Sequence, residues 1–359
     1  MTTKHSLILV LCLFFGLIQA QNKLVPYNNQ HISYEGRILY QPNAAVLSWP
    51  GTSVSIRFKG TEISAIMQDQ DTANYYNVII DGKVAAKIHT DTIKHSYVLA
   101  SGLKDGNHTV ELFKRTEWDK GKTLFYGFKL AGKTKLLTLP APEKRKIEFY
   151  GNSITCGYGD EDPHGHNSSL GCFENNYASY AAITARHFHA QYRCIAKSGI
   201  GIMVSWFPLI MPEMYNRLDP TNPASKWNFS KYTPDIVVIN LFQNDSWIVN
   251  MPNNPQFKAR FGTQKPDAAF IVKSYKDFVA SIRKKYPHAS IICTLGSMDA
   301  TRAGSPWPEY VKQAVKELND SKIYTHFFPY KNTDGHPSVA EQNEMATSLI
   351  QFINKQIQW

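Results

Sequence analysis

The first third of the chain is patterned as short β-strands. Apolar and polar residues alternate, as in Val54, Ile56 and Phe58, which predicts strands with one face in a core and one in water. The same alternation places Val110, Leu112, Leu124, Tyr126, Phe128 and Leu130 on inward faces. Asp81-Gly82 separates two apolar runs and predicts a tight hairpin, because glycine tolerates the positive φ that such turns need. We therefore expect an all-β sandwich of jelly-roll type over residues 21–140.

Beyond a linker rich in proline and charge, at 139–146, strands alternate with helices. Four short apolar runs lack strict alternation, and this is typical of parallel strands covered on both faces. These runs span residues 147–150, 236–242, 290–295 and 323–328. Apolar residues recur at helical spacing from 271 to 286 after Asp267, a predicted N-cap, and a capping box at Ser338 opens a final helix. The pattern predicts an α/β domain with a three-layer, parallel-sheet architecture over residues 145–359.

The amino-terminal segment has the pattern of a secretory signal peptide. Lys4 precedes an apolar run, Leu7 to Ile18, and a small residue, Ala20, stands at the expected cleavage point. We expect residues 1–20 to be removed and the protein to be secreted or periplasmic. No later segment is apolar for long enough to cross a bilayer, so no membrane span is expected.

Composition and charge narrow the partners. The 359 residues are 43% hydrophobic and 19% charged, which excludes collagen, coiled coil and wholesale disorder. The net charge of +10 is spread along the chain rather than gathered in basic blocks. Nucleic acid is therefore not an expected partner.

Four cysteines remain after the signal peptide. Cys194 and Cys293 lie in apolar runs, and we expect buried thiols there. Cys156 and Cys172 flank a polar loop, and the sequence leaves open whether they pair or stay free. Their spacing matches no zinc site.

Small polar residues with catalytic potential follow the predicted parallel strands. Because loops gather at the carboxyl ends of such strands, Ser153, Gly199, Asn244 and His336 are expected at one edge of the sheet. The arrangement predicts Ser153 as nucleophile and His336 as general base, with Asp334 orienting the imidazole. The Asn244 amide and the Gly199 N–H would stabilise the oxyanion. Structural alternatives are a helix N-cap at Ser153 and ordinary turns or strand-end contacts at the others.

Aromatic residues near these positions are candidate platforms for a sugar ring. Trp247 follows Asn244 closely, Trp307 lies in a proline-bounded loop, and Tyr158 follows the expected nucleophile. We expect these three to contact substrate and assign Trp206 and Trp227 to packing.

A metal site is the alternative for one acidic loop. Asp160, Glu161, Asp162, His164 and His166 are close in sequence, but no known ligand spacing matches them. A solvated loop beside the active site is the favoured interpretation.

Four ordered blocks of the second domain resemble the SGNH, or GDSL-type, hydrolase superfamily. They are Tyr150-Gly151-Asn152-Ser153-Ile154-Thr155, Ser198-Gly199, Asn244-Asp245 and Asp334-Gly335-His336-Pro337-Ser338. The β-region is similar to the jelly-roll domain of carbohydrate esterase family 2, whose members include acetylxylan esterases. Its similarity lies in Gly36-Arg37, Trp49-Pro50-Gly51, residues 56–60 and residues 77–82. Together the two resemblances cover nearly the whole chain after the signal peptide.

The resemblance implies a secreted serine esterase that removes O-acetyl groups from plant polysaccharides such as xylan or mannan, without metal or cofactor. It assigns Ser153 as nucleophile, His336 as base, and the Ser153 amide, Gly199 and Asn244 as the oxyanion hole. The chain departs from the superfamily at two places. Phe242 stands where the third block usually has glycine, and the usual acid three residues before the histidine is replaced by Thr333. Asp334, two residues before, has the spacing of family 2, some of whose members work with a Ser-His dyad.

Three other functions remain as alternatives. A non-catalytic glycan-binding protein would use the hydrolase-like half as a scaffold, but such a scaffold has no reason to keep Ser153, Asn244 and His336 together. A short-chain lipid or thioester hydrolase would share the chemistry on another substrate. A metal-dependent deacetylase would use the acidic loop.

Overall fold

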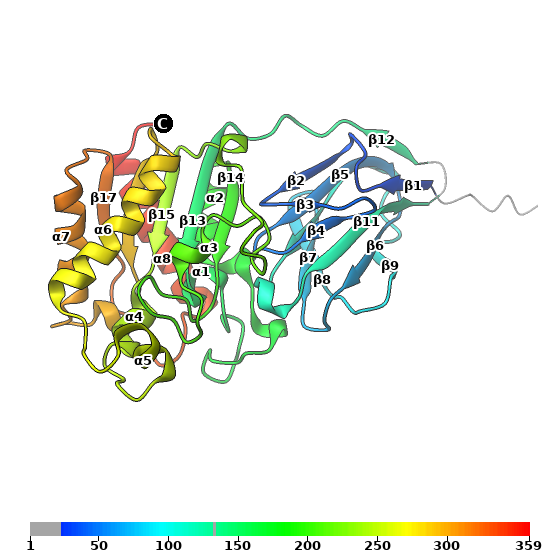
Figure 1. The fold of residues 1–359 in the computed structure, drawn as a ribbon. Coiled ribbons are helices and arrows are strands. Elements are labelled where there is room, and N and C mark those ends of the chain that lie inside the picture. The colour runs from blue at the N-terminus through cyan, green and yellow to red at the C-terminus, as the bar shows by residue number, and fades with distance from the viewer. Residues whose placement is uncertain (1–22, 132–133) are drawn as a thin grey trace, which may run out of the picture.

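The computed structural model describes residues 23–131 and 134–359, so the expected signal peptide lies outside the described residues. Figure 1 shows two regions side by side, an antiparallel β-sandwich (blue to cyan) and an α/β region (green to red). We propose the boundary between two domains at residues 138–144, which separate the last sandwich strand from the first parallel strand.

The sandwich consists of two six-stranded antiparallel sheets. The first has the order β3 (Leu39–Tyr40), β4 (Ala45–Leu47), β11 (Thr123–Leu130), β6 (Ile63–Asp69), β9 (His95–Ala100), with β1 (Lys23–Pro26) also on β11. The second has the order β12 (Lys135–Leu137), β5 (Ser53–Gly60), β10 (Gly106–Lys114), β7 (Tyr75–Ile80), β8 (Lys83–His89), with β2 (Ile32–Glu35) also on β5. Their inward residues form one core, which includes Ile56, Phe58 and Val110. The predicted β-sandwich is confirmed.

Strands β7 and β8 form the predicted hairpin. Ile80 pairs with Lys83, and the two residues between them, Asp81 and Gly82, have φ values of 51° and 80°. Two consecutive positive φ values are the signature of the tight turn that suits the twist of paired strands.

Strand β11 departs from the predicted alternation. The register with β6 shifts between Phe125 and Gly127, so that Phe125 and Phe128 are buried while Leu124 and Tyr126 are partly exposed. The prediction that Leu124 and Tyr126 face inward is therefore wrong. A β-bulge, helped here by the positive φ of Gly127, places one extra residue in the strand and reverses the faces beyond it.

The second region is built on a five-stranded parallel sheet. Its order is β14 (Ala190–Ala196), β13 (Arg145–Gly151), β15 (Ile236–Asn240), β16 (Ser290–Leu295), β17 (Ile323–Phe327). The α-helices are α1 (Ser153–Cys156), α2 (Tyr180–His187), α3 (Met211–Met214), α4 (Gln243–Ile248), α5 (Pro255–Phe261), α6 (Ala268–Lys285), α7 (Trp307–Leu318) and α8 (Val339–Gln356). The 3₁₀ helices of this region are η2 (Gly171–Phe173), η3 (Asn176–Ala178), η4 (Phe229–Lys231) and η5 (Asp299–Thr301), whereas η1 (Trp118–Lys120) lies between β10 and β11 of the sandwich.

Helices cover both faces of this sheet. On the central strand β15, Val237 and Ile239 pack in one core with residues of α6 and α7, while Ile236 and Val238 pack in the other with residues of α2 and α8. The strands are buried on both sides, which explains their continuous apolar runs. Asp267 caps α6 by accepting a hydrogen bond from the Phe270 N–H at 2.8 Å, and Ser338 opens α8 with a capping box, both as predicted.

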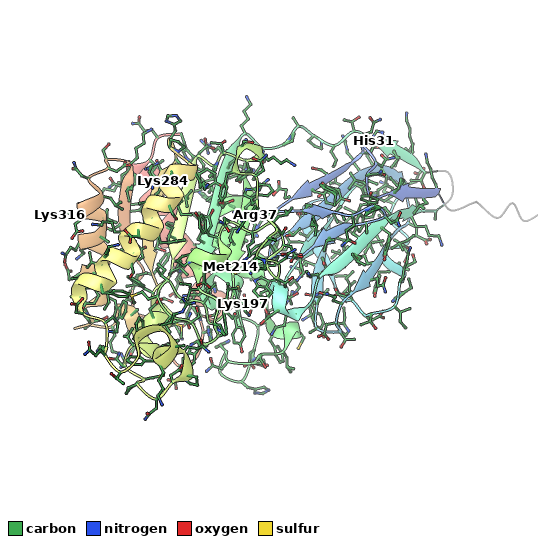
Figure 2. The ribbon with its side chains drawn as sticks, viewed as in Figure 1. His31, Arg37, Lys197, Met214, Lys284 and Lys316 are labelled. Atoms are coloured by element: carbon green, nitrogen blue, oxygen red, sulfur yellow. The ribbon has the colours of Figure 1, made fainter. Side chains whose placement is uncertain are left out.

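A buried arginine joins the two regions. Arg37 follows β2 of the sandwich, and Figure 2 places it between the sandwich and the parallel sheet. Its guanidinium donates to the carbonyls of Tyr215 at 2.6 Å and Arg217 at 2.9 Å, and it lies 3.5 Å from the Glu148 carboxylate. Because the side chains of Arg37 and Glu148 are both fully buried, neither charge can be satisfied by water, and the stability of the interface depends on their contact with each other.

The four cysteines of the described residues are unpaired. Cys156, Cys194 and Cys293 are buried, as predicted for the last two, and Cys172 is partly exposed. Burial raises the pKa of the Cys156 thiol, which keeps it protonated. Within the part of the chain that the structure describes, no helix is both long and apolar enough to cross a bilayer.

Candidate active site

The first strand end places a serine at the start of a helix. Strand β13 ends at Gly151, where a Cβ atom would lie 2.0 Å from the Thr155 Oγ1 atom, so glycine is needed for this tight turn. Asn152, rather than Ser153, is the N-cap of α1, and its side chain accepts a hydrogen bond from the Ile154 N–H at 3.1 Å. The Ser153 hydroxyl is therefore not used as a cap. Its side chain is available for other contacts.

The structure brings Ser153 and His336 together. The His336 Nε2 atom lies 2.9 Å from the Ser153 Oγ atom, although the two residues are 183 positions apart. The segment of His336 is fixed by its backbone N–H, which donates to the His166 carbonyl at 3.0 Å. The pair has the hydrogen-bond geometry of a nucleophile and its general base.

Asn167, not Asp334, contacts the second nitrogen of this imidazole. The His336 Nδ1 atom lies 2.9 Å from the Asn167 Oδ1 atom. The prediction that Asp334 orients the ring is corrected, because Asp334 is exposed and its side chain makes no hydrogen bond among the described residues. Its backbone carbonyl accepts from the Lys331 ammonium at 2.9 Å. The turn at Gly335, with a φ of 70°, packs tightly against the backbone of Gly165, so the loop before Asn167 takes the place beside the imidazole.

His336 is neutral over a wide pH range. Burial lowers the pKa of its imidazole from the ordinary value of 6.5 to about 4, and the nearby Lys331 ammonium contributes to the decrease. The described residues place no carboxylate in hydrogen-bond contact with the ring. A neutral imidazole is the form that can accept a proton.

The loops that follow β14 and β15 are joined by hydrogen bonds. After β14, Gly199 has a φ of 81°, in the left-handed region that favours glycine. The carboxylate of Asp245 accepts the N–H groups of the residues that follow, Ile202, Met203 and Val204. Burial raises the pKa of this carboxyl to about 6, while these N–H groups favour its charged form. The loop that carries Gly199 is thereby fixed to α4.

Asn244 is placed at the same cleft. Its Nδ2 atom donates to the Ile200 carbonyl at 2.8 Å, and its Oδ1 atom accepts from the Trp206 indole at 3.0 Å. Both contacts fix the amide plane, and an amide has a second N–H to offer. Asn244 and Gly199 line the same cleft as Ser153 and His336.

Phe242, the N-cap of α4, has a backbone conformation that favours glycine. Its φ of 80° and ψ of −13° place it in the left-handed region, which costs roughly 1–2 kcal/mol for a residue with a Cβ atom. Its fully buried ring packs 4.8 Å from the Tyr275 ring and 5.0 Å from the Trp307 ring, measured between centroids. Burial of the ring offsets this backbone strain.

A cleft of about 400 Å³ contains all four strand-end residues. It is lined by Glu117, Asp119, Lys120, Ser153, Tyr158, Asn167, Ser169, Lys197, Ser198, Gly199, Trp206, Phe207, Asn244, Trp247 and His336. Volumes of this order are usual for sites that hold small ligands.

The aromatic predictions have mixed outcomes. Trp247 and Tyr158 line the cleft, and the Tyr158 ring lies 4.7 Å from the His336 imidazole. Trp307 does not line it, because its side chain is buried against Phe242 in the core. Trp206, which the sequence assigned to packing, is 44% exposed and lines the cleft. Its neighbours in sequence, Ser205 and Phe207, carry no signal that separates a packing role from a place in the cleft.

The sandwich supplies one wall of the cleft. Glu117, Asp119 and Lys120 belong to η1 and its N-cap, and the Glu117 carboxylate accepts the Ser198 N–H at 2.6 Å. The Lys197 ammonium pairs with Asp119 at 2.6 Å, and Figure 2 shows Lys197 near the sandwich. Sequence reasoning missed these residues because their role depends on how the two regions dock.

Acidic residues of the loop at 160–166 make hydrogen bonds and an ion pair that fix the backbone beside the cleft. Glu161 pairs with Arg115, and the Asp162 carboxylate accepts the N–H groups of His164, Asn167 and Ser168. A different group, Glu117, Cys156 and Glu174, has potential metal-ligand atoms within 4.8 Å of one another among the described residues. Two of these three already serve as acceptors: Glu117 for the Ser198 N–H and Glu174 for the Glu117 N–H at 2.5 Å.

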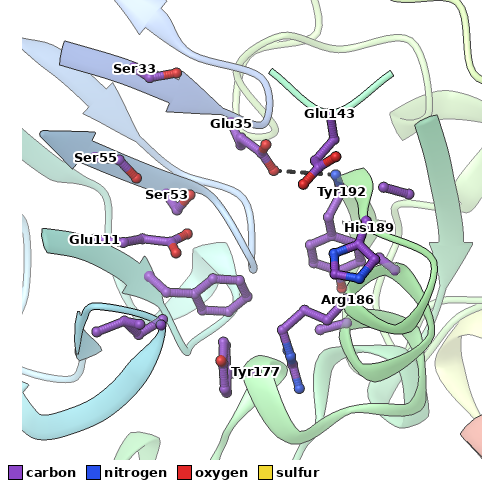
Figure 3. Close-up of a pocket in the computed structure, with 16 residues that line it drawn as sticks. Ser33, Glu35, Ser53, Ser55, Glu111, Glu143, Tyr177, Arg186, His189 and Tyr192 are labelled. Carbon is purple, nitrogen blue, oxygen red and sulfur yellow. Dashed lines mark hydrogen bonds between the residues drawn. The ribbon is translucent and has the colours of Figure 1, made fainter. Parts of the chain in front are cut away.

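A second cavity, of about 490 Å³, lies between the sandwich and α2. Figure 3 shows Glu35 and Glu111 on the sandwich side and Arg186 and Tyr192 opposite, with the Tyr192 N–H donating to Glu35 at 3.3 Å. Burial and the nearby Glu111 carboxylate raise the pKa of Glu35 to about 7. Ser33, Ser53, Ser55 and His189 line this cavity, but no hydrogen bond among the described residues joins a serine to the histidine there. The smaller cleft, where Ser153 contacts His336, is therefore the candidate active site.

A hydroxyl and a neutral imidazole in contact, beside amide donors at the edge of a parallel sheet, define a serine-dependent carboxylic ester hydrolase. Comparison with known families agrees. Residues 34–140 match the family model described as "Carbohydrate esterase 2 N-terminal", and residues 149–324 match the "GDSL-like Lipase/Acylhydrolase family".

Relatives extend this likeness over both regions. A solved family two carbohydrate esterase from Clostridium thermocellum, in complex with cellohexaose, is 36% identical with a TM-score of 0.81, and the match covers 91% of this chain and 99% of that one. The chain therefore belongs to carbohydrate esterase family 2.

Two curated relatives are also similar. The cellulase/esterase CelE of Acetivibrio thermocellus is 36% identical over 344 residues, 92% of this chain, and the chain spans 40% of the length of that relative. An acetylxylan esterase / glucomannan deacetylase of Cellvibrio japonicus is 24% identical over 351 residues, 95% of this chain and 93% of the relative.

Proposed function

We propose that the protein is an exported carbohydrate O-acetyl esterase that acts on plant polysaccharides of the xylan or mannan type. The observation that carries the proposal is the 2.9 Å contact between Ser153 Oγ and His336 Nε2 in a cleft that is also lined by Tyr158, Trp206 and Trp247. The contact between the hydroxyl and the imidazole gives acyl-transfer chemistry. The aromatic rings offer flat apolar faces to the C–H groups of a sugar. Export rests on the signal-peptide pattern of residues 1–20.

The reaction proceeds in two steps. His336 takes the proton of the Ser153 hydroxyl as its oxygen attacks the acetyl carbonyl, and the backbone N–H groups of Ser153 and Gly199 and the Asn244 amide stabilise the oxyanion. Collapse of this intermediate breaks the bond to the sugar oxygen, which leaves with the proton from His336. Water, deprotonated by the same imidazole, then attacks the acetyl-serine and releases acetate.

Acetate release from two polymers tests this function. The protein should release acetate from acetylated xylan and from acetylated mannan, and the ratio of the two rates would identify the preferred polymer. Nitrophenyl acetate should be cleaved much faster than a long-chain nitrophenyl ester, since the cleft is small. Faster cleavage of the long-chain ester would indicate a lipid hydrolase. A serine mechanism also predicts that the rate of acetate release is the same with and without a chelator.

Binding without turnover is the result that would favour the non-catalytic alternative. The relative solved with cellohexaose shows that an unacetylated glucan can occupy a family 2 esterase. Titration of this protein with cellohexaose, alongside the acetate assay, separates the two functions. Glycan binding with no acetate release from either polymer would replace the esterase proposal.

The pH profile should reflect the low pKa of His336. Because the base works only when neutral, kcat/KM should be lost as the pH falls through about 4, and activity at pH 5.5 should be close to its plateau. The measurement is kcat/KM on nitrophenyl acetate from pH 3 to 9. A half-maximal point near 6.5, the ordinary value for imidazole, would contradict it.

Asn244→Ala should lower kcat by roughly 10²-fold, about 3 kcal/mol, with little change in KM, because the oxyanion forms only in the transition state. Steady-state kinetics on nitrophenyl acetate measures both constants. Asn250→Ala, two residues beyond α4 and exposed, is the control and should behave as the wild type. A rise in KM with unchanged kcat would assign Asn244 to substrate binding instead.

A further inference from the structure

The imidazole of His336 is held at both ring nitrogens. Nε2 lies 2.9 Å from Ser153 Oγ, and Nδ1 lies 2.9 Å from Asn167 Oδ1. To take the serine proton, Nε2 must carry no hydrogen, so the neutral ring carries its hydrogen on Nδ1. That hydrogen needs an acceptor. The amide oxygen of Asn167 is the acceptor that the structure supplies.

The orientation of this amide decides the tautomer. With Oδ1 toward the ring, Asn167 stabilises the tautomer in which Nε2 is free to act as a base. With the amide reversed, its NH₂ group would donate to Nδ1 and favour the tautomer that carries hydrogen on Nε2, which cannot deprotonate Ser153. Only the first orientation leaves Nε2 free to accept the proton of the Ser153 hydroxyl, which lies 2.9 Å away.

The loop that carries Asn167 is built to hold it. The Asp162 carboxylate accepts the N–H of Asn167 at 3.2 Å and that of Ser168 at 3.0 Å. The preceding residue, His166, accepts the His336 N–H through its carbonyl at 3.0 Å. Loop and imidazole are thus tied by one backbone contact and one side-chain contact, which fixes their distance.

We propose that Asn167 is the positioning residue of this esterase, holding His336 in its productive tautomer where a Ser-His-Asp triad has a carboxylate. The inference rests on the proposed function of Ser153 and His336. A neutral amide can orient the ring, but it gives no ion pair to the imidazolium that forms during the reaction. Asn167 therefore orients the imidazole of His336 but does not stabilise the positive charge of the imidazolium.

The charges around His336 do not replace the missing carboxylate. On its own side, Lys331 is 3.8 Å from Glu341, and Asp162 is engaged with backbone N–H groups. Across the cleft, the charged residues are Glu117, Asp119, Lys120 and Lys197. Of these, Lys197 pairs with both Asp119 and Glu117. A carboxylate at position 167 would be the first in direct contact with the ring.

Asn167→Asp is the discriminating variant, because it keeps the shape and the acceptor oxygen while adding a charge. The midpoint of the acid limb of kcat/KM should rise by roughly 1–3 pH units, as expected for an imidazolium beside a carboxylate. Asn167→Ala should lower kcat about tenfold with KM within about twofold, since one hydrogen bond that orients the base is lost. Asp334→Asn is the matched control and should leave both constants and the profile unchanged.

An acid limb that does not move in Asn167→Asp would overturn the proposal. So would a pH shift in Asp334→Asn of the same size. The downfield NMR resonance of the imidazole Nδ1–H gives a second test: it should be present in the wild type and absent in Asn167→Ala, and its persistence would overturn the assignment. Ser153→Ala separates the esterase function from the role of Asn167. If activity is lost in Ser153→Ala but unchanged by substitution of Asn167, the esterase function stands and only the role of Asn167 is overturned.

Discussion

Replacing Ser153 with alanine is expected to reduce kcat for acetate release by at least about a thousandfold. Among the described residues that line the cleft, Ser153 is the serine whose hydroxyl contacts an imidazole, at 2.9 Å from His336 Nε2, so its loss removes both steps of the reaction. A residual rate above that in water would come from the oxyanion donors, which can still polarise an ester that water attacks directly. The change is measured by kcat on nitrophenyl acetate and on acetylated xylan.

Ser169→Ala is the control for this substitution. Ser169 lines the same cleft but has no contact with His336 among the described residues, so its variant should retain near-wild-type turnover. Thermal unfolding of both variants should match the wild type, because neither change removes apolar packing. Near-full activity in Ser153→Ala would end the proposed mechanism.

Replacing Arg37 with alanine should destabilise the protein by about 3–5 kcal/mol. Its guanidinium is fully buried and satisfies the carbonyls of Tyr215 and Arg217 and the carboxylate of Glu148. Removal takes the cationic partner from the buried Glu148 carboxylate, which keeps, among the described residues, only the hydroxyl groups of Tyr150 and Tyr286 as donors. It also takes a donor from the carbonyls of Tyr215 and Arg217 and opens a cavity between the sandwich and the parallel sheet. Urea unfolding followed by fluorescence gives the free energy.

Arg57→Ala on the same sandwich is the matched control. Its guanidinium makes an exposed contact of 3.4 Å with the Thr138 carbonyl, and contacts of this kind contribute little. We expect its free energy of unfolding to stay within about 1 kcal/mol of the wild type. A loss for Arg37→Ala as small as this would contradict the account of the interface.

Local sequence signals predicted most of the fold. The Asp81-Gly82 turn, the N-cap at Asp267 and the capping box at Ser338 each depend on a few adjacent residues, and the structure confirms all three. The faces of β11 could not be predicted in the same way. The bulge beside Gly127 depends on pairing with β6, more than fifty residues away in sequence, so alternation alone gives the wrong face for Leu124 and Tyr126.

The candidate site could be predicted for those residues that directly follow a parallel strand or its loop. Ser153, Gly199, Asn244 and His336 come together because parallel strands deliver their loops to one edge. Asn167 was not predictable, since it lies in an irregular loop whose path depends on Asp162 and on the tight packing at Gly165.

Aromatic residues show the same limit. Trp206 and Trp307 both lie near proline in sequence, and only tertiary packing makes the first accessible and the second part of the core. Composition and spacing cannot separate these two outcomes, because both require a large apolar side chain.

Trapping the covalent intermediate is the most direct test of acyl transfer through Ser153. The protein is mixed with nitrophenyl acetate, quenched in acid within the first turnover, digested, and its peptides are analysed by mass spectrometry. We expect one acetyl group on the peptide that contains Ser153, and none on that peptide in the His336→Ala variant. Acetate release without acetylation of Ser153, or with the acetyl group on another residue, would contradict it.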